Sequence, residues 1–310
     1  MVARTGPVRG DDPATMPAID STTVLLGIPN VSEGTDLEVL AAIGAAFAAG
    51  GAELLTAAPH TDPDHDRAVF TMAAAPGVLS AALVSGARAA IERIDLAQHA
   101  GLHPHVGAID VVPVVYLDAA RRGAACAEAL VVADRIGAEL GVPVLLYGAL
   151  AGGRTRAELR RGGPAQLAHR LASGELRPDF GSPRAHRTAG AVLVAARPPL
   201  VAFNLELAPP ATAADAHRIA LLIREGGEEG LPGVRAIGLA LAHGGGVAQV
   251  SMNVEDHLRV PLAQVVAAVE RHAVVSAAEL VGLAPRAAFE GWPEHLECRG
   301  RALIEDALGF

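Results

Sequence analysis

Cysteine is scarce in this sequence, since Cys126 and Cys298 are the only two in 310 residues. They lie far apart and no CxxC spacing occurs, which excludes a disulfide-stabilised scaffold and gives no sign of a zinc site. Such low cysteine usage is typical of a reducing compartment. We therefore expect a cytoplasmic protein in which both cysteines pack as small apolar side chains.

Aromatic residues, positive charge and long apolar runs are also in short supply. Aromatics make up 3% of the chain and hydrophobic residues 51%, so small aliphatic side chains must fill the core. The net charge of -9 argues against nucleic acid as a partner. No apolar run reaches the roughly 18 residues that a membrane-spanning helix needs, so no membrane is expected as a partner. Residues 1–21 lack the apolar segment of a secretory signal and are expected to form a disordered lead-in.

What the sequence does contain is a regular alternation of strand-like and helix-like apolar segments. In the first half, strands are expected at 22–28, 52–57, 67–73, 109–117 and 142–148, and helices at 37–49, 76–94 and 118–140. In the second half, paired strands are expected at 189–195 and 198–207, a helix at 213–227, a hairpin of 234–242 with 245–254, and a helix at 260–275. Polar loops are expected at 59–66 and over the arginine-rich stretch 154–187.

This order of elements predicts an α/β (α+β) protein built from two ferredoxin-like α/β sandwiches. We expect the first subdomain to span residues 22–196 and the second to span residues 200–310, with the break near 196–200.

The stretch QHAGLHPHVGAID, residues 98–110, holds His99, His103 and His105. Pro104 restricts His103 to extended backbone, and glycines on both sides permit tight turns, so the loop could hold an imidazole at a fixed angle. An imidazole can take up and return a proton near neutral pH. The residues alone leave three interpretations open: a solvated turn, a catalytic base, or a metal site. The breaks at Gly101 and Pro104 disfavour a helical metal chelate.

Three further stretches carry polar side chains where a ligand could bind. PNVSEG (29–34) joins a strand to a helix, and its Asn30 and Glu33 could line a cleft, although helix capping by Ser32 or Thr35 explains the loop equally well. The basic loop 177–190 could bind a carboxylate or serve as a linker. The strand AFNLEL (202–207) places Asn204 among apolar residues, and a buried asparagine requires a hydrogen-bond partner.

Taken together, these stretches resemble the formimidoyltransferase (formiminotransferase) domain family, of the glutamate formimidoyltransferase type. The resemblance extends from about residue 22 to the C-terminus, and the cyclodeaminase domain found in some members is expected to be absent. Its motifs are IPNVSEG (28–34), RAVFT (67–71), RIDLAQHAGLHPHVGAIDVVPVV (93–115), GVPVLLYG (141–148), PDFG (178–181), VAFNLEL (201–207), AHRIALLIRE (216–225), AQVSMN (248–253) and LVGLAP (280–285).

The resemblance implies an enzyme of one-carbon and histidine metabolism that moves a formimino group between N-formimino-L-glutamate, or a related amino compound, and N5 of tetrahydrofolate. Tetrahydrofolate would be a co-substrate, no metal would be needed, and the protein would be a homodimer with a ligand cleft or tunnel between its subdomains. His103 would be the general acid/base, with Asp95 or Asp110 to orient it. Folate would contact the loop Gly181, Ser182, Pro183, Arg184, Ala185, His186, Arg187, Thr188, Ala189 and Gly190. Substrate would contact Asn30, Glu33, His60, Arg67, His105 and Asn204.

Four positions depart from the family pattern and keep two alternatives open. Leu102 stands where the family has an acid, His105 where it has an arginine, Ala189 where it has an aromatic residue, and Leu222 where it has an asparagine. Histidine cannot bind a carboxylate through two parallel hydrogen bonds as arginine does. The alternatives are a metal-assisted amidine or amide hydrolase that uses the histidine cluster, and a non-catalytic folate-binding relative.

Overall fold

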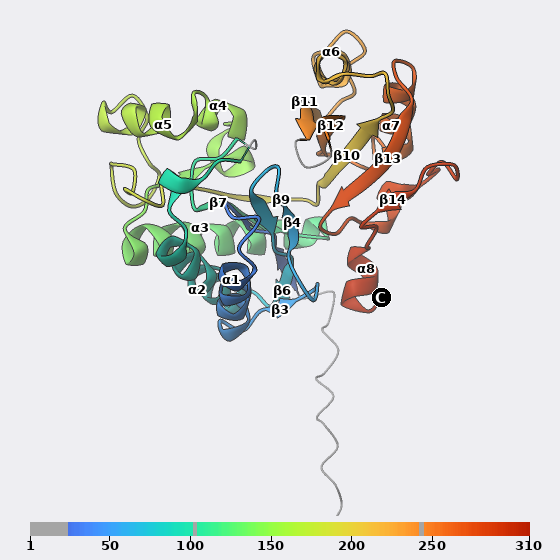
Figure 1. The fold of residues 1–310 in the computed structure, drawn as a ribbon. Coiled ribbons are helices and arrows are strands. Elements are labelled where there is room, and N and C mark those ends of the chain that lie inside the picture. The colour runs from blue at the N-terminus through green and yellow to red at the C-terminus, as the bar shows by residue number, and fades with distance from the viewer. Residues whose placement is uncertain (1–23, 102–103, 242–244) are drawn as a thin grey trace, which may run out of the picture.

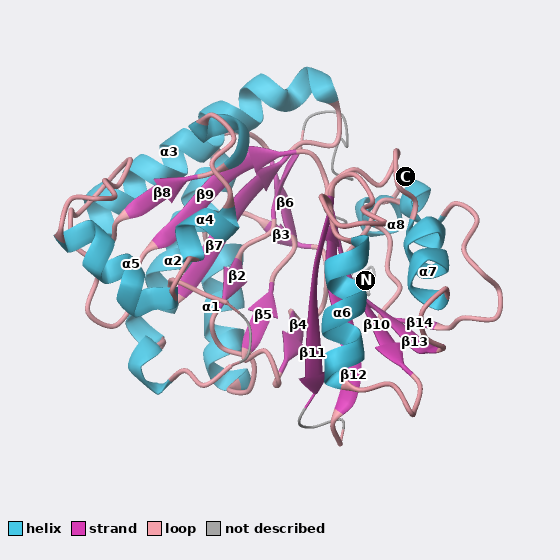
Figure 2. Ribbon diagram, turned by 90° about the horizontal axis from the view of Figure 1, so that it is seen from above, coloured by secondary structure: helices cyan, strands magenta, loops and turns pink. Residues whose placement is uncertain are grey.

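The structure is a computed structural model that describes residues 24–101, 104–241 and 245–310. These residues form two β-sheets, each covered by helices, in two halves that lie side by side (Figures 1 and 2). The expected α/β class is confirmed.

None of the helices in these ranges combines the length and the apolar character needed to cross a bilayer. The strands of the first sheet are β1 (Leu25–Gly27), β2 (Asn30–Val31), β3 (Glu53–Leu54), β4 (His60–Asp62), β5 (Arg67–Val69), β6 (Met72–Ala74), β7 (Ile109–Val115), β8 (Val144–Leu146) and β9 (Val192–Arg197).

The first sheet contains a ferredoxin-like core whose strands are interrupted. β1 and β2 follow one another along β7, and β6 and β5 pair antiparallel with them on the other side. β3 and β4 form the outer edge against β6 and β5. With α1 (Leu37–Ala49) and α2 (Val78–Arg93) as connections, this is the βαββαβ order of a split sandwich. Beyond β7, the parallel strands β9 and β8 extend the sheet.

Helices cover both faces of the extended part of this sheet. α1, α2 and α3 (Arg122–Leu140) pack on one face through the main apolar core. The short helices α4 (Arg156–Arg160) and α5 (Gly163–Ala172) lie on the other face, above β7 and β9 (Figure 1), and bury a smaller core that includes Leu159, Leu167 and Leu171. Single 3-10 turns occur at Leu96–Gln98, Ala119–Arg121, Gly148–Ala151 and Arg286–Phe289.

The second sheet has the order β11-β12-β10-β13-β14, and its first four strands are again ferredoxin-like. One face packs on α6 and α7 through an apolar core, whereas the other face carries polar side chains such as Asn204 and Glu279. Its elements are β10 (Val201–Leu207), α6 (Ala213–Ile223), β11 (Val234–Leu241), β12 (Val247–Val254), α7 (Leu262–Glu270), β13 (Val275–Val281), β14 (Cys298–Arg299) and α8 (Ile304–Leu308).

The C-terminal helix α8 connects the two halves of the molecule. Ile304 and Leu308 pack with Leu26 and Val115 of the first sheet, and Leu283 joins the same cluster from the segment that follows β13. Because these side chains are almost fully buried, the first sheet depends on residues from the far end of the chain.

Several expected elements differ from the structure. Segment 59–66 contains the edge strand β4 rather than loop alone, and 154–187 contains α4 and α5. The strands expected at 189–195 and 198–207 do not pair with each other: β9 pairs with β7 and β8, whereas β10 pairs with β12 and β13. The N-cap of α1 is Asp36, not Ser32 or Thr35, because the Asp36 carboxylate accepts bonds from the amides of Glu38 and Val39. The expected lead-in 1–21 lies outside the described residues.

Candidate functional site

Four loops that are distant in the sequence meet beside the strands of the first sheet. They are 29–34, 62–67, the described part of 96–108, and 182–191. Backbone hydrogen bonds join them: the amide of Ser32 donates to Ala108 at 2.9 Å, and the amide of Leu96 donates to Thr188 at 2.9 Å. The Ser32 hydroxyl adds a bond to the Gly107 carbonyl at 2.8 Å. The loops therefore form one connected unit.

Glycine residues lie where the backbones of these loops approach one another most closely. Gly107 and Gly190 form an isolated β-bridge, and a side chain on either would overlap the carbonyl of Ala191 or Val106. Gly190 also has a positive φ of 66°, which disfavours any residue with a side chain. Gly101 lies equally close to the backbone of His65. These contacts place the histidine loop directly against the predicted folate loop.

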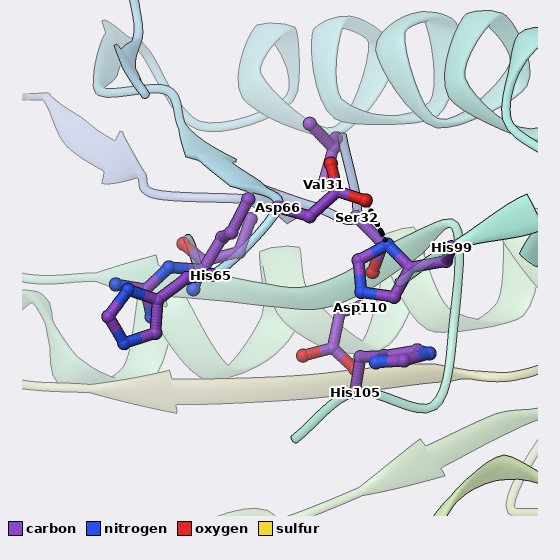
Figure 3. Close-up of a pocket in the computed structure, with 9 residues that line it drawn as sticks. Val31, Ser32, His65, Asp66, His99, His105 and Asp110 are labelled. Atoms are coloured by element: carbon purple, nitrogen blue, oxygen red, sulfur yellow. Dashed lines mark ion pairs between the residues drawn. The ribbon is translucent and has the colours of Figure 1, made fainter. Parts of the chain in front are cut away.

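His99 is held by a carboxylate from another loop. Its Nδ1 lies 3.0 Å from an oxygen of Asp66, and its ring packs edge-on to that of His105 with the centroids 4.0 Å apart (Figure 3). Burial lowers the pKa of His99 from 6.5, the neighbouring His105 lowers it further, and Asp66 acts in the opposite direction. His99 is therefore a neutral side chain at pH 7, and it positions the loop on which His105 lies.

Asp66 itself is fixed by the backbone. It is the only described non-glycine residue with a positive φ, at 47°, and its second oxygen accepts a hydrogen bond from the amide of Gly34 at 3.0 Å. One carboxylate thus links loop 29–34 to His99. A strained backbone conformation that is held by surrounding contacts is typical of functional sites.

Asp110 and Arg160 form an ion pair at the site. The Asp110 carboxylate accepts a bond from the amide of Val106 at 2.7 Å and pairs with the guanidinium of Arg160. Asp95, the other residue expected to orient His103, caps the 3-10 turn by accepting from the amide of Ala97 at 3.0 Å. Both carboxylates thus hold the backbone on either side of the histidine loop.

Arg67 lies beside these groups at the start of β5. Its Nε is buried and makes no hydrogen bond among the described residues. Burial lowers the pKa of Arg67 to about 10, so its guanidinium is still charged at pH 7. A partly buried cation without a hydrogen-bond partner at its Nε is suited to bind a carboxylate. The residues that line this pocket are Asn30, Val31, Ser32, His65, Asp66, Arg67, His99, His105 and Asp110.

A second cavity, of about 240 Å³, lies between the two halves of the molecule. His60 on β4 is one of its lining residues, and its Nε2 is buried without a hydrogen-bond partner among the described residues. The residues that line this cavity are Thr56, Ala58, Pro59, His60, Val69, Thr71, Gly282, Leu283, Gly300 and Ala302.

Comparison with known proteins assigns the family. The model of the formiminotransferase domain, N-terminal subdomain, matches residues 24–197, and that of the formiminotransferase domain matches residues 202–297. The chain belongs to the formiminotransferase domain family. The glutamate formimidoyltransferase of Streptococcus pyogenes serotype M1 is 34% identical over 270 residues, covering 84% of this chain and 89% of that protein. That of Thermoplasma acidophilum is 31% identical over 271 residues, covering 84% and 88%.

The formimidoyltransferase-cyclodeaminase of Gallus gallus is 37% identical over 275 residues, or 84% of this chain. The match covers 50% of that relative, and a similar match covers 43% of the relative from Sus scrofa. The chain thus spans about half the length of these relatives.

Within this formiminotransferase-family chain, the predicted site residues fall into separate groups. Asn30, Arg67 and His105 line the pocket, and His60 lines the cavity between the halves. Asn204 donates to Glu279 at 2.9 Å on the second sheet. Glu33 instead accepts bonds from the backbone of Thr35 and Asp36, which is a local capping role. His103, the predicted catalytic residue, and Leu102 lie outside the described residues.

The predicted folate loop has a rigid end and an exposed end. Ala189 is fully buried, and the His186 ring accepts a bond from its amide at 3.1 Å. Arg184 and Arg187 are exposed to solvent. Leu222, another departure from the family pattern, packs against the core of the second sheet. The exposed arginines can bind an anionic tail, and the buried end fixes the loop against the histidines.

Sequence reasoning missed the partners that position these side chains. The contacts of Asp66 with His99 and of Glu279 with Asn204 gave no signal in the sequence, because both join residues that are remote along the chain. Within the described ranges, no group of three or more histidine, cysteine, aspartate or glutamate side chains is arranged to hold a metal ion.

Proposed function

We propose that this protein is a folate-dependent formimidoyltransferase. It moves a formimino group between N-formimino-L-glutamate, or a related amino compound, and N5 of tetrahydrofolate, with His103 as general acid/base. The observation that carries the proposal is the contact between the histidine loop and the loop 181–190 in a chain of this family. It supports a site at which a base and a folate meet.

The reaction requires one proton to leave N5 and one to reach the departing nitrogen. N5 of tetrahydrofolate attacks the formimino carbon and gives a tetrahedral intermediate. His103 takes the proton from N5 and gives it to the glutamate nitrogen, after which the bond between that nitrogen and the formimino carbon breaks. The double bond to the remaining nitrogen re-forms, so the products are 5-formimino-tetrahydrofolate and glutamate. A single imidazole can perform both transfers in sequence.

The remaining residues of the site would bind and orient the substrates. Arg67 is suited to a carboxylate of the donor because its guanidinium is charged and its Nε is free of hydrogen bonds. Arg184 and Arg187 are suited to the carboxylates of the folate tail because they are exposed on the folate loop. The Asp66–His99 pair would hold the histidine loop at a fixed angle.

The further expectations are a homodimer that acts in the cytoplasm, with subdomains over 22–196 and 200–310. Both cysteines are free thiols, as expected in a reducing compartment. Sedimentation analysis of the purified protein tests the homodimer, and a monomer at micromolar concentration would contradict it.

The direct test is an assay with tetrahydrofolate and a panel of formimino donors: N-formimino-L-glutamate, N-formimino-L-aspartate and N-formimino-glycine. We expect 5-formimino-tetrahydrofolate to form, fastest with the glutamate donor, and the rate to be unchanged by EDTA. Donor hydrolysis that needs a metal and no folate would instead support the hydrolase alternative. Folate binding without turnover of any donor would support a non-catalytic relative.

A further inference from the structure

Arg197 is a partly buried cation without an ion-pair partner among the described residues. It ends β9, and the Nε atom of its guanidinium is buried and makes no hydrogen bond in the described ranges. Its Nη1 donates to the Pro198 carbonyl at 2.9 Å, which is a neutral partner. Burial lowers the pKa of Arg197 to about 10, so the side chain is charged at pH 7. A buried charge is costly unless an opposite charge balances it, which an anionic ligand would do.

Tyr147 lies next to Arg197 on the same face of the first sheet. Its amide donates to the Val194 carbonyl at 3.1 Å, which places it beside the end of β9. Its side chain is 6% exposed and packs in one core with Ala195, and alternate residues of a strand, such as Ala195 and Arg197, share a face. The Tyr147 hydroxyl is buried and has no hydrogen-bond partner among the described residues. A buried polar atom of this kind calls for a ligand or a functional role.

Arg156 brings a second cation to the same place. Its guanidinium carbon lies 5.8 Å from the centre of the Tyr147 ring, within the range of a cation–π contact. Arg156 is the first residue of α4, and the capping box of Thr155 and Glu158 fixes this helix start. None of the described carboxylates forms an ion pair with Arg156. Two guanidiniums therefore meet at one tyrosine without an anion between them.

These two cations act on the pocket that contains Arg67. The charge of Arg156 lowers the pKa of both Arg67 and Arg197, so all three guanidiniums repel one another less when an anion binds near them. Guanidinium pairs with carboxylates through two parallel hydrogen bonds. N-formimino-L-glutamate carries two carboxylates, of which Arg67 accounts for one, whereas Arg184 and Arg187 are suited to the folate tail. The second carboxylate of the donor is thus without an assigned partner.

We propose that Arg156 and Arg197 form a subsite for a carboxylate, that Tyr147 positions Arg156 through its ring, and that the second carboxylate of the formimino donor occupies the subsite. The subsite rests on the proposed function and deepens it, because it explains how a dicarboxylate donor is selected over one with a single carboxylate. Binding here involves ion pairs and hydrogen bonds, with no covalent step. The folate tail carries the same chemical group, so the test separates the two sources.

Calorimetric titration of the full-length protein with formimino donors, in the absence of folate, tests the subsite without turnover. We expect the wild type to bind N-formimino-L-glutamate more tightly than N-formimino-glycine, which has one carboxylate. Arg156→Gln and Arg197→Gln are each expected to weaken binding of the glutamate donor about 10- to 100-fold, the usual effect of losing a hydrogen bond to a charged group. Binding of the glycine donor is expected to stay as in the wild type. Raised salt should weaken the glutamate donor more in the wild type than in either variant.

Three further variants separate a binding role from a structural one. Tyr147→Leu removes the ring under Arg156 and is expected to weaken the glutamate donor, whereas Tyr147→Phe keeps the ring and is expected to recover most of that loss. Arg197→Lys keeps the charge and is expected to recover part of the affinity lost in Arg197→Gln. Arg224→Gln is the matched control, because Arg224 is exposed after α6 and its loss changes the net charge equally.

Titration with tetrahydrofolate and with 6-methyltetrahydropterin, which lacks the tail, identifies the source of the carboxylate. We expect neither affinity to change in Arg197→Gln. A loss that affects tetrahydrofolate and not 6-methyltetrahydropterin would place the folate tail in the subsite and overturn the assignment to the donor. Equal affinity of the wild type for the two donors, or wild-type affinity for the glutamate donor in folded Arg156→Gln and Arg197→Gln proteins, would overturn the subsite itself.

The binding measurement also separates the subsite from the proposed reaction. If Arg197→Gln weakens binding of the glutamate donor while the wild type forms no 5-formimino-tetrahydrofolate, the formimino transfer fails and the subsite stands. If transfer proceeds and the KM for the donor is the same in the wild type, Arg156→Gln and Arg197→Gln, the subsite fails and the transfer stands.

Discussion

At the scale of single residues, the geometry of the site depends on side chains that hold other side chains in position through hydrogen bonds and ion pairs. Asp66 is the clearest case, because one of its oxygens accepts from the amide of Gly34 and the other pairs with His99. His99 in turn packs against the ring of His105. A carboxylate at a positive-φ position thus sets the angle of an imidazole on a separate loop.

Asp66→Asn tests this link. Asparagine keeps an oxygen for the Gly34 amide and loses the negative charge, which normally raises the pKa of His99. We expect that pKa to fall further, and kcat/KM for the transfer to fall by about 10-fold because the loop is less well positioned. NMR titration of the His99 ring measures the first effect, and an unchanged titration would show that Asp66 does not act on His99.

Local features of the site are visible in the sequence, whereas the partners that position its side chains are not. The Gly-Pro pattern around His103 and the buried position of Asn204 were visible in the sequence, since both follow from local backbone preference or hydrophobic periodicity. The pairing of Asp66 with His99 depends on tertiary contact between two loops. The bonds that Glu33 accepts from the backbone of Thr35 and Asp36 follow from its place beside a helix start, where a glutamate can bond the nearby backbone.

At the scale of elements, the site depends on how closely the histidine loop and the folate loop approach. Gly107 bridges to Gly190, and the amides of Ala108 and Ala191 extend the same ladder. The short antiparallel contact therefore fixes the described part of the histidine loop against the predicted folate loop.

Gly190→Ala is expected to open this contact. The new side chain would overlap the Val106 carbonyl and would have to adopt a φ of 66°. We expect a loss of about 2–4 kcal/mol in the free energy of unfolding and a raised KM for tetrahydrofolate. Gly123→Ala is the control, because its side chain would meet nothing within 4 Å and the position is helical, so the change should stay within about 1 kcal/mol. Equal effects of the two substitutions on urea denaturation would contradict the prediction.

Elements were predictable where the apolar pattern is strong. α1 has the expected bounds, and α3 ends before Gly141, whose φ is 68°, as its sequence indicates. α4 and α5 were missed because few apolar residues mark them and their polar faces are rich in arginine. β9 was wrongly paired with β10, although its unbroken apolar run is typical of a parallel strand buried on both faces.

At the scale of the whole molecule, buried histidines tie stability to pH. Burial is the largest cause that lowers the pKa of His60, His99 and His257 from 6.5. The folded chain keeps these rings neutral, whereas the unfolded chain binds protons near pH 6.5. The stability that these neutral rings contribute is therefore present above about pH 6.5. It is lost as the pH falls toward the pKa values that the histidines have in the folded chain.

Urea denaturation between pH 8 and pH 5.5 measures this dependence. We expect the free energy of unfolding to fall with decreasing pH across that range, and to fall less steeply in His257→Gln. His217→Gln is the control because His217 is exposed, and its slope should equal that of the wild type. A free energy of unfolding that is constant or rises as the pH falls would contradict the assignment of neutral buried histidines.

The relation between the two halves was beyond prediction from the sequence. α8 packs on the first sheet although it lies at the opposite end of the chain, and His60 lines one cavity together with Gly282 and Leu283. Both depend on long-range packing, which leaves no periodic signal in the sequence. The two ferredoxin-like units themselves were predictable, because each repeats a recognisable order of strands and helices.

The most direct test of the central claim compares the wild type with His103→Gln in the conversion of N-formimino-L-glutamate and tetrahydrofolate to 5-formimino-tetrahydrofolate. We expect clear turnover by the wild type and a fall of about 100- to 10,000-fold in kcat for the variant, with tetrahydrofolate binding retained. Absence of turnover by the wild type, or undiminished turnover by the variant, would contradict it.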